Sequence, residues 1–594
     1  MALDLRPRAR AACAAHRIVA RVAYLFRFLL NLLRSLLFPI WVLRRRPWSR
    51  TTSRWIRADL AHHLTQFRAG RSPLQRLTSS ARGNGISSLD RLRVFVDEAS
   101  RDPQVHGVLL TVPPLAVGWA TCESLRELIT SLRAASKQVV CYLPHGGGNR
   151  ELYVALAADR IYVTPYASFG PLGLALSPLY FRPLLDRLGV RVEALASGEY
   201  KSAAEPGLRE TMSEAAREQL DALLAARQRA LATALKLRGL TVDEVDQLFA
   251  NALVLADEAL ARRVIDGVAY EDELPDTLRA LDGAPTRQED DAPQPLSAAR
   301  YLRVKRRLWL PLRAAETIAV VPLHGMITGE LPGGVGGGLK ETTLGPLLRG
   351  LAKDPQVRAV VLHIDSPGGS ALASEQMHHQ IKQLARKKPV VACFGEVAAS
   401  GGYYLACACN KIVAHDLCTT GSIGVVMTKI DAHDLAAKLG LRPQSLRTTQ
   451  SADLLSPARS LSEHEHALLS GHVAQLYQRF LAVVAEGRGR SPEEIDHVAR
   501  GRVWTGSAAK DRGLVDAIGS MERALSEARA LVPELTVRER SALKPQVFRL
   551  KSGRVFSLSG LLLRAWLPWL GELAAIASLA RNAVLFYAPH TPDD

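Results

Sequence analysis

Short runs of apolar residues, rather than one long stripe, dominate the hydrophobic pattern of this chain. Residues 107–110 and 389–394 form such runs, and so does 359–362, which His-Ile-Asp extends as a strand to residue 365; glycine or proline follows each within a few positions. Runs of this length and continuity predict buried strands. Two capping boxes, Thr241 to Glu244 and Ser491 to Glu494, predict helix starts.

The same pattern occurs twice. Asp-Pro-Gln-Val precedes the apolar run at 102–105 and again at 354–357. Further along, 157–163 matches 408–414, and Gly170 to Gly173 matches Gly421 to Gly424, both at an offset of 251 positions. The sequence therefore predicts two tandem copies of one domain rather than a solenoid of short repeats.

Domain boundaries follow from length and composition. The 594 residues exceed what one core serves, and a stretch rich in proline, aspartate and glutamine starts near Asp282. We therefore predict five parts: an N-terminal segment (1–60), a first repeat (61–282), a linker (283–315), a second repeat (316–535) and a C-terminal tail (536–594).

Positive charge is concentrated before the first repeat. The whole chain carries +18, and residues 1–57 hold thirteen arginines but one acidic residue, Asp4. In a helix, Arg17, Arg21, Arg27 and Arg34 share one face, and leucines and other apolar residues fill the rest. This pattern favours a helix lying in a membrane interface over a span, because the arginines interrupt the apolar run that a span needs.

The C-terminal tail, the basic residues of the repeats and the cysteines bear further on the class of protein. The tail 561–588 is apolar and aromatic, which fits membrane contact and packing on protein equally well. Basic patches interleaved with aromatics are absent from the repeats, so we do not expect nucleic-acid binding. The seven cysteines lack Cys-x-x-Cys spacing, so we expect no disulfide framework, no metal site and no cofactor, and most cysteines in the core.

Ser400 is the first candidate for chemistry. It follows the predicted strand 389–394 in the segment Ala398 to Gly402, and a helix is predicted from Tyr403 onward. A serine on a strand-to-helix turn lies near free backbone N–H groups that stabilise negative charge. Taken alone, it could equally be a helix N-cap.

A glycine pair offers the complementary donors. Gly368 and Gly369 follow the predicted strand 359–365, and with Gly401 they could form an oxyanion hole. The matching location in the first copy holds Pro113 and Pro114, which cannot donate.

Lys201 is the candidate general base, in the segment Gly198 to Pro206. A lysine normally titrates near 10.4, so it can serve as a base only if burial lowers its pKa. Ser422 is the hydroxyl expected to orient the amine. When the two copies are aligned at the offset of 251, Asn149 of the first copy matches Ser400, and Ala452 of the second copy matches Lys201. Neither copy holds both groups, so the sequence predicts one site assembled from two repeats.

A Ser–His–Asp triad is the rival arrangement. His415 and Asp416 follow Ser400, but neighbours on a strand point to opposite faces, which disfavours them as base and orienter. His363 is interpreted as a strand residue.

These segments together resemble the signature segments of the signal peptide peptidase A (protease IV) family, the serine–lysine peptidases of family S49, in its long tandem form over about residues 65–535. The resemblance implies an α/β fold of two ClpP/crotonase-like domains and a membrane-associated homotetramer that cleaves signal peptides. It assigns Ser400 as nucleophile, Lys201 as base, and Gly368, Gly369 and Gly401 as oxyanion donors. It also implies a location at the bacterial inner membrane, and an arginine excess before any span would put the protease domain on the periplasmic side.

Two other classes stay open at this point. A crotonase-type acyl-CoA enzyme would share the fold and its backbone oxyanion holes, although it would not need a serine and a lysine split between copies. A catalytically inactive membrane scaffold would use only the repeats and the basic segment.

Overall fold

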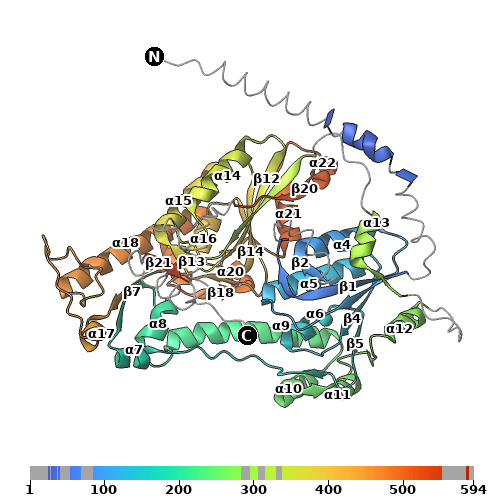
Figure 1. Cartoon of the computed structure of the whole chain (residues 1–594), viewed down its shortest axis with the longest axis horizontal. Helices are drawn as coiled ribbons and strands as arrows, with labels where there is room; N and C mark the ends of the chain where they lie inside the picture. Colours follow the sequence, from blue (N-terminus) through green and yellow to red (C-terminus); the bar gives the residue numbers. More distant parts are fainter. Residues whose placement is uncertain are drawn as a thin grey trace. The chain divides into compact units, whose positions relative to one another are not determined.

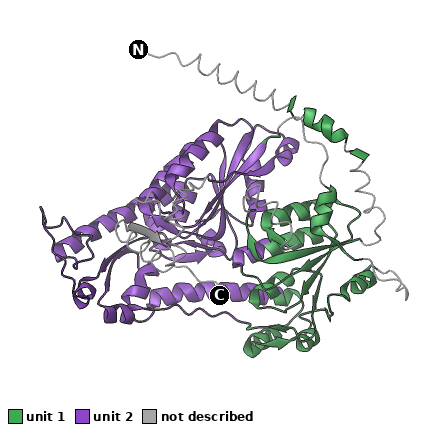
Figure 2. Cartoon of the chain, in the orientation of Figure 1, with its two compact units in different colours: residues 1–116, 125–172, 235–316 green, residues 117–124, 173–234, 317–594 purple. Residues whose placement is uncertain are grey.

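The computed structural model describes residues 25–26, 28–36, 38–39, 54–68, 85–282, 294–305, 315–329, 338–550 and 584–587. The chain divides into two compact units, coloured separately in Figure 2. Unit 1 comprises residues 1–116, 125–172 and 235–316, and unit 2 comprises residues 117–124, 173–234 and 317–594. Unit 2 thus includes two segments of the predicted first repeat, 117–124 and 173–234, and the second of these carries Lys201.

Unit 1 is built on a parallel sheet with the order β10-β1-β3-β4-β5-β9, and β2 pairs with β1 (Figure 1). Its strands are β1 (Trp55–Thr65), β2 (Ile86–Ser88), β3 (Gly107–Thr111), β4 (Gln138–Leu143), β5 (Arg160–Val163), β9 (Gly267–Val268) and β10 (Leu296–Ser297). Unit 1 also contains a short antiparallel pair of strands, β6 (Ser168–Phe169) and β8 (Val254–Leu255). The helices are α4 (Leu89–Arg101), α5 (Trp119–Ala134, which belongs to unit 1 from Leu125 on), α6 (Asn149–Ala155), α10 (Val242–Asn251), α11 (Ala256–Ala261), α12 (Leu274–Leu281) and α13 (Ala298–Lys305).

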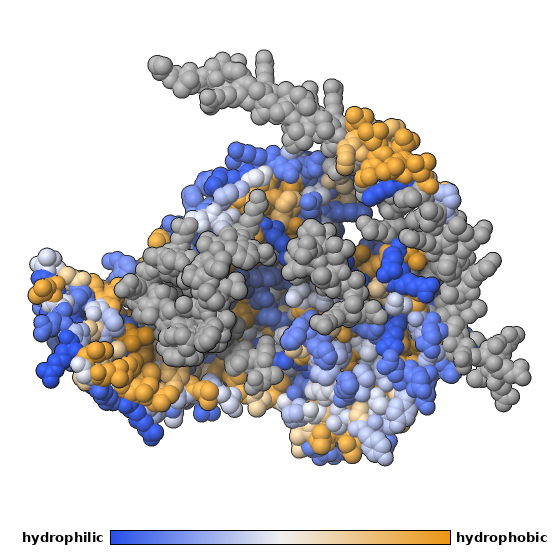
Figure 3. Space-filling view, viewed as in Figure 1, coloured by the Kyte–Doolittle hydropathy of each residue, from blue (hydrophilic) through white to orange (hydrophobic). Residues whose placement is uncertain are grey.

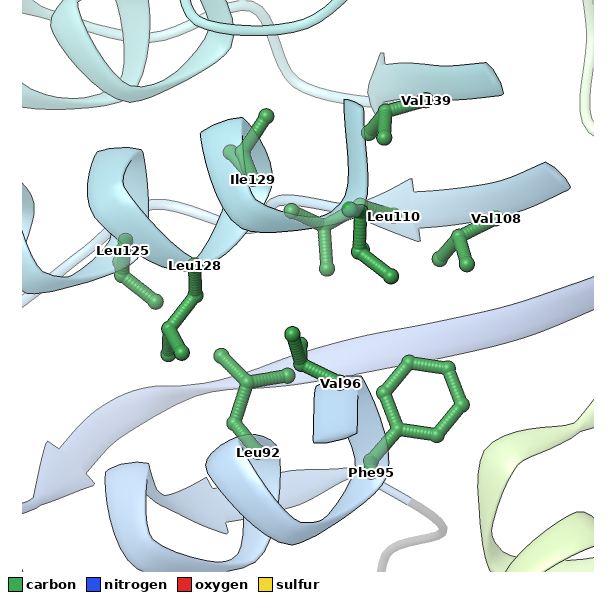
Figure 4. Close-up of a pocket in the computed structure, with 10 residues that line it drawn as sticks. Leu92, Phe95, Val96, Val108, Leu110, Leu125, Leu128, Ile129 and Val139 are labelled. Carbon is green, nitrogen blue, oxygen red and sulfur yellow. The ribbon is translucent and has the colours of Figure 1, made fainter. Parts of the chain in front are cut away.

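The core of unit 1 is apolar and tightly packed. Figure 4 shows side chains of α4 and α5 pointing at those of β3 and β4 around a cavity of about 10 Å³. Its ten lining residues, among them Leu92, Phe95 and Leu128, carry no polar side chain. A cavity of this size is at the lower limit for one water molecule, so it is a packing gap and not a ligand site.

Unit 2 holds a larger sheet with the order β18-β16-β14-β12-β11-β20, to which β15 and β19 add beside β14. Pairing is parallel throughout except between β16 and β18. The strands are β11 (Thr317–His324), β12 (Val357–Ser366), β14 (Val390–Ala399), β15 (Lys411–Ala414), β16 (Thr419–Gly421), β18 (Val503–Thr505), β19 (Ala517–Ile518) and β20 (Lys544–Val547).

A second sheet in unit 2 is antiparallel and has four strands in the order β13-β21-β17-β7. They are β7 (Arg191–Ser197), β13 (Gly368–Ser370), β17 (Val425–Asp431) and β21 (Val584–Tyr587). The helices of unit 2 are α7 (Arg182–Leu188), α8 (Glu205–Leu208), α9 (Glu214–Leu237), α14 (Glu341–Lys353), α15 (Ala371–Ala385), α16 (Gly401–Ala406), α17 (His433–Lys438), α18 (Glu463–Arg488), α19 (Pro492–Val498), α20 (Gly506–Asp511), α21 (Met521–Ala530) and α22 (Val537–Ala542).

The prediction of an α/β protein is confirmed by these mixed layers. Both capping boxes are also confirmed, because the side chains of Thr241 and Ser491 accept hydrogen bonds from the backbone N–H groups three residues on. The predicted strand 389–394 was too short, since β14 continues through Gly395 to Ala399 and ends directly at Ser400.

The second half of the predicted linker contains two elements of unit 1. Residues 296–305 form β10 and α13, and Tyr301 of α13 is fully buried, with its hydroxyl donating to Asp102 Oδ2 at 3.0 Å. The sheet of unit 1 also starts at Trp55, before the predicted boundary at 61.

Parts of both predicted tails lie outside the described residues, as do Arg17, Arg21, Arg27 and Cys13. Residues 28–35 are helical, with exposed leucines and phenylalanine. None of the helices in the described part of the chain is long and apolar enough to cross a membrane. The six described cysteines are free thiols, and all but Cys409 are buried, as expected of small core residues.

Candidate active site

Ser400 lies on the sharp turn between β14 and α16. Its backbone has φ 54° and ψ −118°, and the residue is fully buried. A positive φ is unfavourable for a residue with a side chain, and such strain persists only where neighbours impose it. Here the backbone N–H of Ser400 donates to the carbonyl of Gly421 at 2.8 Å, and its own carbonyl accepts from the Tyr404 N–H at 2.9 Å.

The antiparallel pairing of β7 with β17 carries Lys201 to this turn. The register runs from Arg191 opposite Asp431 to Ser197 opposite Val425. Ser422 precedes β17 and Lys201 follows β7, so the two residues meet at the same end of the ladder. Both residues belong to unit 2, although Lys201 comes from the predicted first repeat.

The amine of Lys201 has three close oxygen neighbours. Its Nζ lies 3.0 Å from Ser400 Oγ, 2.8 Å from Ser422 Oγ and 2.8 Å from the Ser422 carbonyl oxygen. A neutral amine that donates its two hydrogens to the oxygens of Ser422 directs its lone pair toward Ser400 Oγ. This is the arrangement that a general base for the serine hydroxyl requires.

Burial sets the protonation of Lys201. The residue is 5% exposed, and this burial lowers the pKa of its amine well below the usual value of a lysine. Desolvation penalises the charged ammonium because water no longer solvates it. A lysine of this kind has a substantial neutral fraction at a lower pH than an exposed lysine.

Two glycines, Gly198 and Gly501, let the loop that carries Lys201 pack closely against residues 500–501. The N–H of Tyr200 donates to the carbonyl of Arg500 at 2.9 Å. Gly501 has φ 81°, and a Cβ on it would come within 2.6 Å of the backbone nitrogen of Lys201. Gly198, with φ 102°, packs against Arg500 in the same way. A side chain at Gly501 would therefore displace the lysine backbone.

Gln219, on α9, was not predicted and fixes the same loop. It is fully buried, and its amide nitrogen donates to the Tyr200 carbonyl at 3.1 Å and to Ser202 Oγ at 2.9 Å. Its amide oxygen accepts from the Val503 N–H at 3.1 Å. A glutamine inside an amphipathic helix carries no sequence signal of this role.

The predicted oxyanion glycines lie next to one another. A Cβ on Gly401 would come within 3.2 Å of the Gly368 Cα, so the two backbones are in direct contact. Gly401 is the first residue of α16, and a first residue has no acceptor for its N–H within the helix. The Gly368 N–H donates to Ser366 Oγ at 3.2 Å, while Gly369 adopts φ 145° in β13.

In the first repeat the matching positions lack this chemistry. Asn149 begins α6, as Gly401 begins α16 just after Ser400, and its Nδ2 donates to the carbonyl of Pro171 at 3.1 Å. Pro171 occupies the position that matches Ser422. In the first repeat, the positions that match Ser400 and Ser422 are therefore joined by a hydrogen bond between an amide and a carbonyl. Neither of these groups is a nucleophile.

The histidines of the rival triad lie elsewhere in unit 2. His415 Nε2 is 3.1 Å from Ser124 Oγ, and His363 Nδ1 is 2.7 Å from His324 Nε2. The amine at the Ser400 hydroxyl is that of Lys201, so the geometry favours a lysine over a histidine base.

A half-buried residue, Glu396, stands four residues before Ser400 and was also not predicted. Its oxygens accept from the N–H groups of Ala120 at 2.9 Å and Thr121 at 2.8 Å, in the first turn of α5. Burial raises the pKa of Glu396 to about 7. The carboxylate thus ties β14, which carries Ser400, to the segment 117–124 within unit 2.

Comparison with known proteins identifies the family of this chain. The profile of peptidase family S49 matches the chain twice, at residues 131–284 and 382–533. Serine protease SPPA, chloroplastic, of Arabidopsis thaliana is 30% identical over 454 residues, which cover 76% of this chain and 66%, just under two thirds, of that protein. Protease 4 of Salmonella typhi is 33% identical over 453 residues, covering 73% of this chain and 71% of that one.

Among solved structures, a ClpP1 mutant from Listeria monocytogenes matches with 17% identity and a TM-score of 0.23, covering 34% of this chain and 93% of that chain. The double match of the family profile agrees with the repeat seen in the sequence. Together with two relatives aligned over most of this chain, it assigns the protein: the chain belongs to peptidase family S49 and is a serine-type peptidase with two tandem α/β domains.

Proposed function

We propose that this chain is a membrane-associated serine endopeptidase that uses Ser400 as nucleophile and Lys201 as general base. Its proposed substrates are cleaved signal peptides and other hydrophobic peptides. The observation that carries the proposal is the 3.0 Å contact between a buried lysine amine and the hydroxyl of a strained serine. The names of relatives such as the putative signal peptide peptidase SppA of Enterococcus faecium support the substrate class.

The reaction begins with proton transfer from Ser400 to Lys201. Ser400 Oγ attacks the carbonyl carbon of the scissile bond, and the neutral Lys201 amine takes the hydroxyl proton. The lysine then gives this proton to the leaving nitrogen as the C–N bond breaks. A water molecule, deprotonated by the same amine, hydrolyses the acyl ester on Ser400 and restores the site.

The tetrahedral intermediate needs donors for its oxyanion. The Gly401 N–H, at the start of α16, is the first of these in the proposal, and the Gly368–Gly369 turn in contact with it supplies the second. Ser422 orients the lysine by accepting hydrogen bonds from its amine. Every group in this scheme is a side chain or backbone amide of the chain itself.

Membrane attachment and oligomer formation are further parts of the proposal. The arginine-rich segment 1–57 supports contact with lipid headgroups at the bacterial inner membrane, with the protease domain on the periplasmic side. Exposed apolar side chains of Leu179, Phe181, Leu184 and Leu188 gather on and before α7, where Figure 3 shows orange at the lower left. An apolar patch of this kind suits association with further copies in a homotetramer.

A peptide-cleavage assay tests the proposed function. The full chain in detergent should cleave a synthetic signal peptide, whereas Ser400→Ala and Lys201→Ala should each lose at least about 10³-fold in kcat. Ser541→Ala and Lys510→Ala change exposed residues of the same types and should keep full activity. Undiminished cleavage by either site variant would refute the assignment, and hydrolysis of acyl-CoA but no peptide would favour the crotonase alternative.

A further inference from the structure

The segment just before β18 contacts both the loop that carries Lys201 and the turn that carries Ser422. The carbonyl of Arg500 accepts a hydrogen bond from the Tyr200 N–H at 2.9 Å. Two residues later, the carbonyl of Arg502 accepts from the Ser422 N–H at 2.7 Å. All of these residues belong to unit 2. The segment is therefore a common support for the lysine loop and for the residue that holds the lysine amine.

The side chain of Arg502 makes a second connection to the lysine loop. Its guanidinium carbon lies 4.7 Å from the centre of the Tyr200 ring, and its Nη1 donates to the Tyr200 hydroxyl at 3.3 Å. The same guanidinium carbon lies 4.4 Å from the centre of the Trp504 ring. A planar guanidinium is attracted to the faces of aromatic rings and keeps a defined orientation on them. Because Tyr200 directly precedes Lys201, this stack restrains the backbone from which the lysine extends.

Glu218 of α9 belongs to the same cluster. Its carboxylate accepts from the Tyr200 hydroxyl at 2.9 Å and forms an ion pair with Arg502 Nη2 at 2.7 Å. The side chain of Glu218 is 52% exposed, whereas that of Arg502 is 19% exposed. An ion pair with a partner this exposed contributes little, because water and salt screen it. The stack of Arg502 on Tyr200 is therefore the contact that we expect to restrain the loop.

We propose that Arg502 is a positioning residue for the general base, and that it couples the Lys201 loop to the Ser422 turn. This inference rests on the proposed function of Ser400 and Lys201. The backbone carbonyl of Arg502 holds Ser422, and its guanidinium holds Tyr200. The Lys201 amine is thereby kept at 3.0 Å from Ser400 Oγ, with its lone pair directed at the hydroxyl.

Loss of the stack should impair turnover more than substrate binding. A displacement of about 1 Å between reacting groups can cost about 10²-fold in rate. Arg502→Met keeps the length of the side chain and removes the guanidinium, so it should lower kcat at least about tenfold with KM nearly unchanged. Steady-state cleavage of a synthetic signal peptide by the full chain in detergent measures both constants.

Arg512 provides the matched control. Its guanidinium carbon lies 3.8 Å from the centre of the Trp504 ring, so it makes the same kind of stack on the other neighbour of Arg502. Its Nη1 donates to the Ala508 carbonyl at 2.9 Å, within α20 and the residue that follows it. Arg512→Met therefore also removes a stacked arginine and should keep the wild-type kcat. Urea unfolding of each variant measures how much stability it has lost.

Two variants of Tyr200 test the same contact from the side of the loop. Tyr200→Leu removes the ring and should lower kcat about as much as Arg502→Met, whereas Tyr200→Phe keeps the ring and should restore most of the rate. The double variant of Tyr200→Leu and Arg502→Met should lose no more than either single variant, because both changes remove one contact. If Arg502→Met does not fold, the comparison of Tyr200→Leu with Tyr200→Phe decides the question.

The outcomes separate this inference from the proposed function. If cleavage depends on Ser400 but Arg502→Met and Tyr200→Leu keep the wild-type kcat, the inference is wrong and the proposed function stands. A loss carried by KM alone would assign Arg502 to substrate binding, which also contradicts the inference. If Ser400→Ala and Lys201→Ala both cleave the peptide as wild type does, the proposed function fails and this inference fails with it.

Discussion

The amine of Lys201 lies 3.0 Å from the hydroxyl of Ser400, although 199 positions separate the two residues in the sequence. The antiparallel ladder between β7 and β17 closes this separation, because Lys201 follows one strand and Ser422 precedes the other. The loop that carries Lys201 packs against Arg500 and Gly501, so three distant parts of the chain define one position. A site of this kind depends on the tertiary fold much more than on local sequence.

The pH dependence of activity should report the ionisation of Lys201. Only the neutral amine can accept the proton of Ser400, so kcat/KM should rise with pH through a single ionisation well below 10.5, since burial lowers the pKa of Lys201. The measurement is kcat/KM for a peptide from pH 5 to 10. A profile that still rises near 10.5 would mean that this lysine is solvated in the working enzyme. Lys510→Ala should give the wild-type profile.

Stability should depend on pH for the same reason. A lysine with a lowered pKa in the folded state binds fewer protons than in the unfolded state, so the free energy of unfolding should rise with pH from the folded pKa up to 10.5. The slope should reach about 1.4 kcal/mol per pH unit. Lys201→Met has no group that titrates at this position, so its free energy of unfolding should lack this rise. Urea unfolding at a series of pH values up to 10.5 measures the difference.

The matched control for that series is Lys510→Met, at an exposed position, which should keep the wild-type slope. Equal slopes for wild type and Lys201→Met would show that the lysine keeps its proton on folding, against the role proposed for it.

Replacing Ser422 should impair turnover more than binding. Ser422→Ala removes one of the two oxygens that hold the amine, while the backbone carbonyl remains. A misdirected lone pair should lower kcat by up to about 10²-fold with KM nearly unchanged. Steady-state kinetics of Ser422→Ala beside Ser541→Ala measures this. A loss carried by KM alone would assign Ser422 to substrate binding.

Gln219 should matter for both stability and activity. Gln219→Leu keeps the size of the side chain but leaves the Tyr200 carbonyl, Ser202 hydroxyl and Val503 N–H without their partner. Each unpaired buried group costs about 1–3 kcal/mol, so unfolding should occur at clearly lower urea concentration and kcat should fall. Gln228→Leu, on the same helix, should change neither. Normal kcat in Gln219→Leu would show that the Lys201 loop is held by other contacts.

Much of the site could be predicted from the sequence because the chain contains two copies of one pattern. The comparison of Asn149 with Ser400 and of Ala452 with Lys201 singled out two residues that would look ordinary alone. The strands and the turn at Ser400 were also predicted, since short apolar runs ending in glycine specify them locally.

What the sequence did not predict depends on contacts between distant residues. Gln219 and Glu396 act through backbone groups of other segments, and such partners leave no periodic or motif signal. The extension of β14 past Gly395 follows from its pairing with β16, which begins near Thr419. The assignment of residues 296–305 to unit 1 likewise depends on the hydrogen bond between Tyr301 and Asp102, which are far apart in the sequence.

The most direct test of the central claim is covalent labelling with a fluorophosphonate, followed by peptide mapping, in wild type and Lys201→Ala. The account predicts one labelled residue, Ser400, with a labelling rate that rises with pH through the ionisation of Lys201 and falls at least about 10²-fold in Lys201→Ala. A label on a different serine, or an unchanged rate of Ser400 labelling without the lysine, would contradict it.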